Sequence, residues 1–492
     1  MTPSRPPATP VPSRPAPAPE ADGRAPAPWR ALSLVLVGVF MAVLDTFIVL
    51  VAAPAIRSGL HASDADVQLV LAGYQLAYAL ALITGARLGD RYGRKRCFLL
   101  GMGAFTLASV ACAAAPAPGA LIAARVAQGL AAAVMFPQVF AVIQVVLPPE
   151  RRARAFGVLG AVIGLAGVAG QLLGGALLAA DLFGASWRPL FWVNVPVGVV
   201  TSALAAVYLP ESRAAGRHRL DLTGAAVLTL ALFLLIVPLI EARNAAWAPW
   251  LRCGPLAGAA ALYGFVVVER RVEARGGAPL LRPRLLGDRA FATGIALVLL
   301  TYCQINSFFL ILSLTLQDGL GLDALGAGLC YLPFAAAFFA GSVATGRRSR
   351  PGHGPLRAGA LILALGYAVT LTTVAALGAA LTPWALVAPL LLVGLGNGVL
   401  VPPLLHTVLA RIAPAETGMA SGVLSTGQQV GGSAGVAVLG LVFYDALGGA
   451  ARHDTGAWAH ALAAALVLSL ALAVAVRVLL RWLPGEAGPG SH

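Results

Sequence analysis

The stretch "GARLGDRYGRKR", residues 85–96, concentrates charge in a chain that otherwise carries little of it. Six of the ten residues from Arg87 to Arg96 are charged, whereas charged residues make up only 11% of the whole chain. Long apolar runs lie on both sides, and 59% of the 492 residues are hydrophobic. Because a soluble domain carries about 25% charged residues, this composition predicts an all-α protein whose solvent is the lipid bilayer.

Apolar runs long enough to cross a bilayer recur along the whole chain, since about 20 such residues are needed for one helix. We predict fourteen spans, at roughly 31–55, 66–86, 97–115, 118–146, 154–180, 189–209, 221–241, 247–268, 290–316, 323–345, 358–378, 382–408, 417–443 and 458–481. The opening stretch then joins the second span to the third.

The basic residues predict the orientation of these spans. If the N-terminus is cytoplasmic, 28 of the 34 lysines and arginines lie in cytoplasmic segments and five lie outside. This asymmetry favours an even number of spans with both termini in the cytoplasm. The net charge of +14 could suggest nucleic-acid binding, but the charges lie in short loops between apolar spans rather than on one soluble face. We therefore expect no nucleic-acid partner.

An internal repeat organises the spans into two halves. A shift of 265 residues places Gly129 on Gly394, Pro137 on Pro402 and Gly170 on Gly435. The chain is thus expected to contain six spans, an inserted pair and six further spans, a parallel repeat of the kind known from transporters. The predicted regions are a disordered Pro/Ala-rich cytoplasmic tail at 1–30, a six-helix bundle at 31–209, the inserted pair with its cytoplasmic flanks at 210–289, a second six-helix bundle at 290–482, and a short cytoplasmic tail at 483–492.

The charged stretch resembles a loop signature of the major facilitator superfamily, G-x-L-x-D-R-x-G-R-[KR]. Residues 86–95 read ARLGDRYGRK, so Ala86 replaces the first glycine. The resemblance implies the major facilitator fold and a gating loop between its halves, formed by Arg87, Gly89, Asp90, Arg91, Gly93, Arg94 and Lys95. The alternative is that the arginines serve only as a topology signal, although that leaves Asp90 and the two glycines unexplained.

The first span carries "LDTFIVLVAAPAI", 44–56, which resembles the L-D-x-T-I-V-N-V-A-L-P motif of the fourteen-helix drug:proton antiporter branch. Leu50 stands where the motif has asparagine. Asp45 is the acid that lies well inside a span, where a charged residue costs about 2.5–3.5 kcal/mol or more. It is therefore expected to carry protons, unless it is merely capped by hydroxyls such as that of Thr46.

The fourth span carries "RVAQGLAAA", 125–133, which matches the family motif R-x-x-Q-G-x-x-x-A. At 1.5 Å per residue, Arg125 and Asp45 both lie roughly 10–15 Å from the outer ends of their spans. A direct or water-bridged pair is therefore expected, and a nearby arginine would change the protonation of the acid. The alternative is that Arg125 is a structural partner only.

The fifth span carries a stripe of glycines at three- and four-residue spacing, which predicts close helix packing. Its end resembles the antiporter motif G-P-x-x-G-G, with Gln171 in place of proline. The expected packing residues are Gly167, Gly170, Gln171, Gly174 and Gly175. The segment "WRPLFWVNVPVG", 187–198, also resembles a motif of this branch.

Polar residues near mid-depth give a hypothetical substrate path, although each could equally join helices. They are Gln128, Gln304, Asn306, Asn397 and Gln428. Two catalytic patterns fail. "GGSAG", 431–435, lacks the strand-turn-helix setting of a nucleophile elbow, and Lys95 is followed by Arg96 rather than by the hydroxyl residue of a P-loop. The protein is thus predicted to be no enzyme, with neither metal nor cofactor.

The leading hypothesis is a monomeric secondary transporter of the plasma membrane. It would exchange protons for small hydrophobic or cationic compounds by alternating access, driven by the proton gradient. One alternative keeps the fold and changes the cargo to a specific endogenous metabolite or natural product. An alternative of another class is a membrane receptor or scaffold that transports nothing.

Overall fold

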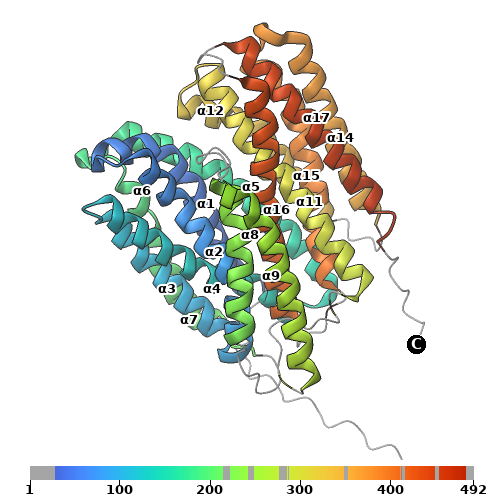
Figure 1. Ribbon diagram of the computed structural model, residues 1–492. Helices are drawn as coiled ribbons and strands as arrows, with labels where there is room; N and C mark the ends of the chain where they lie inside the picture. The colour runs from blue at the N-terminus through green and yellow to red at the C-terminus, as the bar shows by residue number, and fades with distance from the viewer. Residues whose placement is uncertain are drawn as a thin grey trace, which may run out of the picture.

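The computed structural model describes residues 28–213, 222–241, 249–275, 277, 285, 287–347, 353–410, 412, 416–448 and 454–483. Regular structure in this part of the chain is helical. The first half (Figure 1) consists of α1 (Pro28–Leu60), α2 (Asp64–Tyr92), α3 (Arg94–Ala113), α4 (Pro118–Val146), α5 (Pro149–Ala180), α6 (Pro189–Trp192) and α7 (Asn194–Tyr208).

The second half lies beside the first in Figure 1 and repeats its order of helices. It consists of α11 (Arg289–Leu314), α12 (Ala324–Cys330), α13 (Leu332–Arg347), α14 (Gly354–Leu377), α15 (Val387–Ala410), α16 (Thr417–Leu447) and α17 (Thr455–Leu479). Between the halves in sequence come α8 (Leu222–Glu241) and α9 (Pro249–Ala274).

Within the described residues, 12 helical segments are long and apolar enough to cross a membrane. They match the predicted spans outside the inserted pair. In the inserted pair, the described part of α8 contributes a shorter apolar helix, Ala226–Leu235, so the fourteen-span layout stays a prediction. The predicted tails lie almost wholly outside the described residues, at 1–27 and 484–492.

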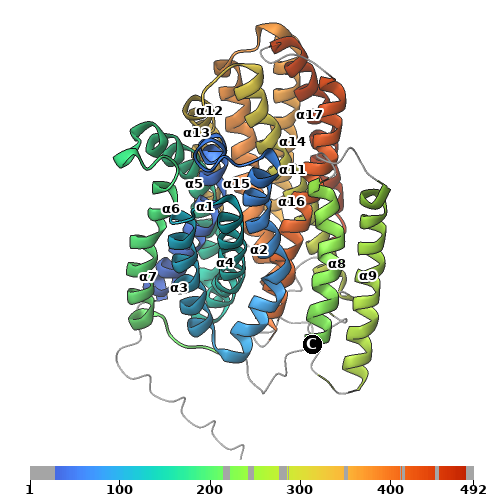
Figure 2. The ribbon, with the colours of Figure 1, turned by 60° about the vertical axis from the view of Figure 1, so that its left-hand side comes forward.

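The inserted pair packs along the outside of the molecule. Helices α8 and α9 lie side by side, and α8 also contacts α2 of the first half and α16 of the second (Figure 2). The pair therefore covers one of the two seams along which the halves meet. At the other seam α5 packs against α12, α13 and α15.

Two expected spans are interrupted. The span predicted at 189–209 is divided at Val193 into α6 and α7, and the span at 323–345 is divided at Tyr331 into α12 and α13. Proline explains both breaks, because it lacks the N–H that an α-helix requires four residues after each carbonyl. Pro196 cannot bond the Trp192 carbonyl, and Pro333 cannot bond the Leu329 carbonyl.

A further difference concerns the charged stretch, which the sequence places in a loop. Helix α2 continues to Tyr92 and α3 begins at Arg94, so only Gly93 lies between them. The helices extend beyond their apolar parts because the charged side chains can leave the bilayer while the backbone stays hydrogen-bonded. The stretch is thus a tight corner between two helices.

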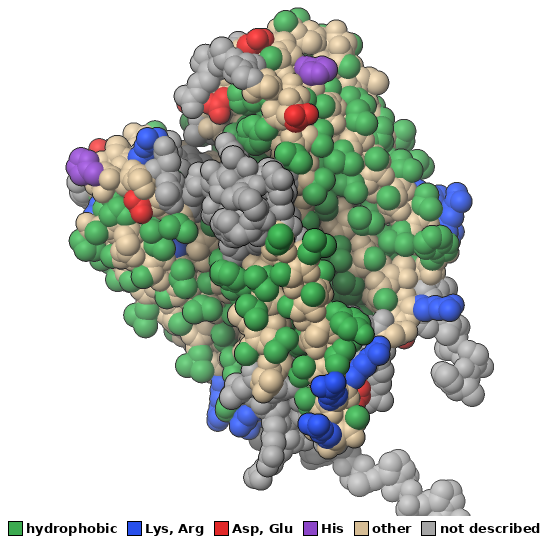
Figure 3. All heavy atoms as spheres, viewed as in Figure 1, with side chains coloured by type: hydrophobic (Ala, Val, Ile, Leu, Met, Phe, Trp, Pro, Cys, Tyr) green, Lys and Arg blue, Asp and Glu red, His purple; other side chains and the backbone are tan. Residues whose placement is uncertain are grey.

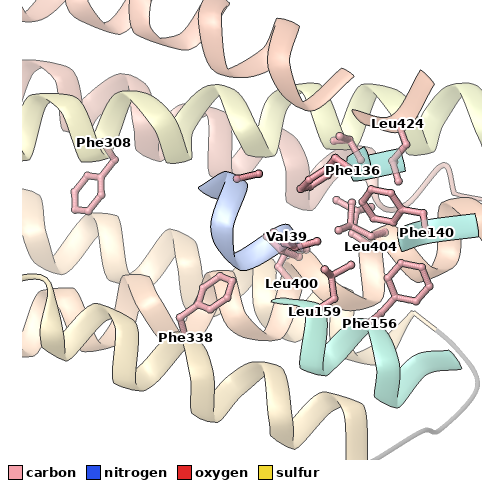
Figure 4. Packing of buried hydrophobic residues seen from close by; sticks show 14 of the residues in the cluster. Val39, Phe136, Phe140, Phe156, Leu159, Phe308, Phe338, Leu400, Leu404 and Leu424 are labelled. Carbon is pink, nitrogen blue, oxygen red and sulfur yellow. The ribbon is translucent and has the colours of Figure 1, made fainter. Parts of the chain in front are cut away.

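Buried apolar side chains connect the halves. Figure 4 shows Phe156 and Leu159 of α5 beside Leu400 and Leu404 of α15. At mid-interface the ring centroids of Phe47 on α1 and Phe309 on α11 are 6.2 Å apart. The core therefore runs through both bundles.

Lysine and arginine side chains gather at the lower end of the molecule in Figure 3, and acidic and histidine side chains gather at the upper end. We call the lower end the basic end. It contains the corner between α2 and α3.

Candidate functional site

Asp45 lies in the middle of α1 with its side chain fully buried. Its Oδ2 forms an ion pair with NH1 of Arg125 from α4. Its Oδ1 accepts two further hydrogen bonds, one from Nε2 of Gln128 and one from Nδ2 of Asn194, each 2.9 Å long. Helices α1, α4 and α7 thus converge on one carboxylate.

Arg125 is fixed by contacts on every side. Its Nε donates to the Val70 carbonyl at 3.2 Å, and its NH1 also donates to Oε1 of Gln128 at 2.6 Å. The guanidinium carbon lies 4.4 Å from the ring centroid of Tyr74 and 5.9 Å from that of Phe191. Aromatic faces attract a cation in a desolvated site, so the cation has strong neighbours besides Asp45.

A second layer surrounds these residues. Oγ of Ser109 accepts from Nε2 of Gln128 at 2.7 Å and from Nδ2 of Asn194 at 3.1 Å. Sγ of Cys112 lies 3.7 Å from Oε1 of Gln128. Helix α3 therefore contributes a hydroxyl and a thiol, and four helices share the network.

The arrangement holds one negative and one positive charge together inside the helical bundle. A buried ion pair stabilises a protein little, because desolvation of two charges offsets their attraction. The pair therefore needs another reason to be present. A carboxylate buried beside a fixed cation, with hydrogen-bond donors already in place, can exchange a proton whenever water reaches it.

The corner at the basic end is held by a second buried pair. NH2 of Arg94 lies 3.1 Å from Oδ1 of Asp90, and both side chains are only 2% exposed. Gly93, between the helices, has a φ of +109°, which favours glycine. A Cβ there would also lie 2.6 Å from Cδ of Glu211. Position 93 is therefore restricted to glycine by its backbone and by its neighbour.

Glu211 fastens the chain after α7 to this corner. Its Oε1 accepts from the backbone N–H of Lys95 at 3.2 Å, and its Oε2 lies 3.7 Å from Nε of Arg96. The backbone N–H of Arg94 donates to the Ser212 carbonyl at 3.0 Å. A carboxylate at a helix N-terminus is favourably placed, so the segment after α7 caps α3.

The remaining residues of the motif are placed around this corner. Gly89 packs against the side chain of Gln138 on α4, and the Arg91 guanidinium lies 5.1 Å from the ring centroid of Tyr92. Arg87 is half-buried on α2. One turn earlier, a Cβ at Gly422 of α16 would lie 2.9 Å from Cβ of Ala86. The motif thus lies where the two halves meet.

The glycine stripe of α5 packs against different helices along its length. A Cβ at Gly167 would lie 3.4 Å from the Phe47 ring of α1, and one at Gly170 would meet the Leu44 carbonyl at 2.8 Å. A Cβ at Gly175 would lie 3.6 Å from Leu325 of α12. Gly174 is buried, and Gln171, half-buried, lies beside Gly328. The stripe allows α5 to approach α1 and the second half together.

The predicted path residues do not form one group. Gln128 belongs to the Asp45 network, and Gln304 and Asn397 are buried within the second half. Nε2 of Gln428 donates to the Tyr302 hydroxyl at 2.7 Å, and Asn306 is exposed next to Gly432. The position of a residue along a span predicts its depth in the membrane. It does not predict which neighbour its side chain faces, so polar residues at the same depth point in different directions.

Five residues of the site were not among the predicted ones: Tyr74, Ser109, Cys112, Asn194 and Glu211. Asn194 stood inside the quoted motif at 187–198, so its signal was present. Glu211 follows Pro210 directly after a span, where an acid reads as an ordinary surface charge. Ser109 and Tyr74 carry no pattern of their own, because serine and tyrosine are common in helices that span membranes.

A cavity of about 180 Å³ lies at the basic end of the second half. It is lined by Leu285, Asp288, Ala290, Phe291, Thr407, Val408, Ile412 and Glu416. In the described parts of the chain, no three histidine, cysteine or acidic side chains come together as metal ligands.

Comparison with known proteins gives a consistent result. Residues 35–436 match the family model of the Major Facilitator Superfamily. The chain is 42% identical over 422 residues to a probable actinorhodin transporter of Streptomyces coelicolor, covering 85% of this chain and 73% of that protein. It is 35% identical over 431 residues to a tetracenomycin C resistance and export protein of Streptomyces glaucescens, covering 86% and 77%.

Among solved structures, the human organic anion transporter MFSD10 superposes with a TM-score of 0.63. The match covers 92% of this chain and 100% of that one at 17% sequence identity. At this identity the likeness concerns the fold.

Proposed function

The chain belongs to the Major Facilitator Superfamily, and from this membership we propose that it exports a small organic compound across the plasma membrane in exchange for protons. The cargo class follows from relatives named for the export of, or resistance to, natural antibiotics. The observation that carries the proton part is the fully buried Asp45–Arg125 pair.

A narrower candidate has its own support. The relative at 42% identity is named as a transporter of one natural product, actinorhodin. Export of a single endogenous compound is therefore the second candidate, and a panel of compounds distinguishes it from broad drug export. Relatives named for export support transport over the alternative of a receptor or scaffold.

The proposed topology has fourteen spans, with α8 and α9 as the inserted pair and the basic end in the cytoplasm. Basic residues are retained on the cytoplasmic side of membranes, and they gather at the end where α2 meets α3 (Figure 3). The protein is proposed to act as a monomer without a cofactor. The regions 31–209 and 290–482 then form the two bundles that move against each other.

In the proposed cycle, Asp45 binds a proton when the central space opens outward and releases it when the space opens inward. The 86–95 corner, with Asp90 and Arg94, holds the cytoplasmic ends of the halves together in one state and releases them in the other. Of the predicted path residues outside the Asp45 network, Asn306 is exposed and is the one proposed to meet cargo; Gln304, Asn397 and Gln428 position helices.

The test uses purified protein in proteoliposomes with an imposed pH gradient and a panel of aromatic antibiotics and cationic dyes. We expect cargo-dependent proton movement in wild type. Asp45→Asn should abolish gradient-driven transport, because an amide cannot titrate, while downhill cargo exchange persists. Asp445→Asn, at an exposed acid near the end of α16, is the matched control and should behave as wild type. Full gradient-driven transport by Asp45→Asn would remove Asp45 from the mechanism.

A further inference from the structure

The contacts of Asp45 share one chemical property: every one of them is a donor. Arg125, Gln128 and Asn194 all present N–H groups to the carboxylate. This arrangement suits the charged form. A protonated carboxyl also carries an O–H, which needs an acceptor, and an unmade hydrogen bond in a buried site costs about 1–3 kcal/mol.

Arg125 and Gln128 cannot supply that acceptor. A guanidinium has donors only. The amide of Gln128 is held in one orientation, because its Oε1 accepts from NH1 of Arg125 at 2.6 Å. If this amide reversed, its NH2 group would face the N–H groups of Arg125, and two donors would meet.

Asn194 has no such restriction. Its Nδ2 donates to Asp45 and to Oγ of Ser109, while its carbonyl oxygen receives no hydrogen bond from the described part of the chain. The terminal torsion of asparagine is broad and roughly two-fold, so reversal exchanges the amide oxygen and nitrogen in nearly the same space. Ser109 tolerates the reversal, because a hydroxyl both accepts and donates.

We propose that Asn194 is the residue that responds to the proton: it donates to the Asp45 carboxylate, and on protonation its amide reverses and accepts the Asp45 O–H. This inference rests on the proposed role of Asp45 in proton coupling. Asn194 is the first residue of α7 and follows the break at Val193. The reversal therefore takes place where α6 and α7 join. The other end of α7 leads to Glu211, which contacts the 86–95 corner.

The other titratable groups near Asp45 do not replace this response. They are Arg125 from α4, Tyr74 from α2 and Cys112 from α3. The Tyr74 hydroxyl donates to the Ala42 carbonyl at 3.2 Å, and the Cys112 thiol faces Gln128. On α5 the neighbours are Gly167 and Gly170, and on α6 and α7 no titratable side chain is described beside Asp45.

The experiment is infrared difference spectroscopy on the full-length protein, between high and low pH, with the asparagine side-chain carbonyl labelled with ¹³C. The chain has only four asparagines, Asn194, Asn244, Asn306 and Asn397. In wild type, acidification should produce a protonated-carboxyl band and, together with it, a shift of one labelled amide band. Both signals should vanish in Asp45→Asn, and the amide signal alone should vanish in Asn194→Leu.

Transport supplies a second readout. Asn194→Leu removes a charge-assisted bond to the carboxylate and a weaker bond to the acid form. The midpoint of the transport pH profile should therefore move to higher pH by about one unit. Asn397→Leu, which removes a buried asparagine of the second half, should leave the profile unchanged.

The outcomes distinguish the proposed proton binding by Asp45 from the proposed amide reversal of Asn194. A carboxyl band with no change in any labelled amide band in wild type overturns the reversal of Asn194 and leaves the role of Asp45 intact. A pH profile that does not move in Asn194→Leu also overturns it. The absence of any carboxyl band that depends on Asp45 would instead contradict the proposed proton site itself.

Discussion

Two equivalent glycines identify equivalent positions in the two halves. In the first half, Gly170 of α5 packs against the carbonyl of Leu44, the residue before Asp45. In the second half, Gly435 of α16 packs against the carbonyl of Cys303, the residue before Gln304. Gly170 and Gly435 are equivalent in the 265-residue repeat. The structure therefore gives Asp45 a counterpart, and the counterpart is a neutral amide.

The neighbours of the two residues differ in the same sense. The repeat places Leu390 of α15 where α4 has Arg125, and Val393 where α4 has Gln128. Both replacements are buried and apolar. A cation needs a charged partner in a buried site and an amide does not, so the loss of the acid and the loss of the arginine belong together.

The polar groups at and around these two equivalent positions also differ in how well they are satisfied. Both oxygens of Asp45 are hydrogen-bonded. In the second half the two amide atoms of Gln304 and the hydroxyl of Thr301 have no hydrogen-bond partner among the described residues. The comparison indicates that the buried ion pair at this position of the repeat belongs to the first half.

The largest effect is expected when Arg125 is replaced by leucine, the residue that the second half has at the equivalent position 390. Arg125→Leu leaves Asp45 buried without its cation, which costs about 3–5 kcal/mol of stability. Asp45→Leu combined with Arg125→Leu should recover most of that loss, because no buried charge remains. Thermal unfolding in detergent measures both, with Arg481→Leu at an exposed arginine as control. A double variant as unstable as the single one would contradict the pairing argument.

The next effect concerns the corner between the second and third helices of each half. In the first half it contains Asp90, paired with Arg94; the corresponding segment 346–354, GRRSRPGHG, has no acid. Asp90→Ala should favour the state that is open at the basic end, because the Asp90–Arg94 pair holds the corner in the shape that lets Ala86 pack against Gly422 of α16. A charge-assisted contact is worth about 1.5–3 kcal/mol, so the ratio of states should move by about tenfold to over a hundredfold.

Spin-label distances between positions 92 and 357 measure this shift, since both side chains are exposed at the basic end. The labels require a background without the five cysteines. Glu211→Gln should shift the distances in the same direction and by less, because it weakens the cap of α3 and leaves the Asp90–Arg94 pair in place. Unchanged distances in Asp90→Ala would reduce the stretch to a topology signal.

A smaller effect, of opposite sign, is expected at Gln304. Gln304→Leu removes a buried amide whose two polar atoms have no hydrogen-bond partner in the described part of the chain. Replacing an unsatisfied polar group by an apolar one of similar size is neutral or stabilising. The melting temperature should stay equal or rise, and the transport pH profile should not move. A clear fall in the melting temperature of Gln304→Leu would contradict this expectation, because it would show that the Gln304 amide makes stabilising contacts.

The smallest effect concerns the helix caps at the end opposite the basic end. Oγ of Ser63 accepts from the backbone N–H of Asp66 at 3.1 Å at the start of α2, and Oδ1 of Asp323 caps α12 at 2.7 Å. Ser63→Ala should lower the melting temperature by about 1–2 °C. The Ser63 hydroxyl, and then its backbone N–H, donate to the Asp66 carboxylate and lower the pKa of Asp66 below its usual 3.8.

The sign of the pH dependence follows from that shift. A lowered pKa in the folded protein contributes stability above the usual value, and the contribution is lost as the pH falls through the lowered pKa. The difference between wild type and Ser63→Ala should therefore be constant at neutral pH and shrink below pH about 4. A difference that grows on acidification would contradict the cap.

Much of this molecule could be predicted from sequence because its signals are local. Apolar runs gave the twelve spans that the structure has outside the inserted pair. Asp45 and Arg125 were identified because a charge inside an apolar run is rare and costly. The helical corner at Gly93 was not predicted, since it depends on a cap by Glu211 from far along the chain. The break at Val193 has a local cause in Pro196, but an apolar run alone does not show where a helix divides.

The sequence by itself determined that the protein spans a membrane, where its helices lie, that it repeats in two halves, and which charged residues lie inside apolar spans. The tertiary structure alone decided which groups those charges meet: that Asp45 of α1 is surrounded by donors from α4 and α7, that Glu211 caps α3, and that the position equivalent to Asp45 in the second half is the buried amide Gln304. The reason is physical. Burial and hydropathy are properties of single segments, whereas hydrogen-bond satisfaction depends on the rotation and depth of several packed helices at once.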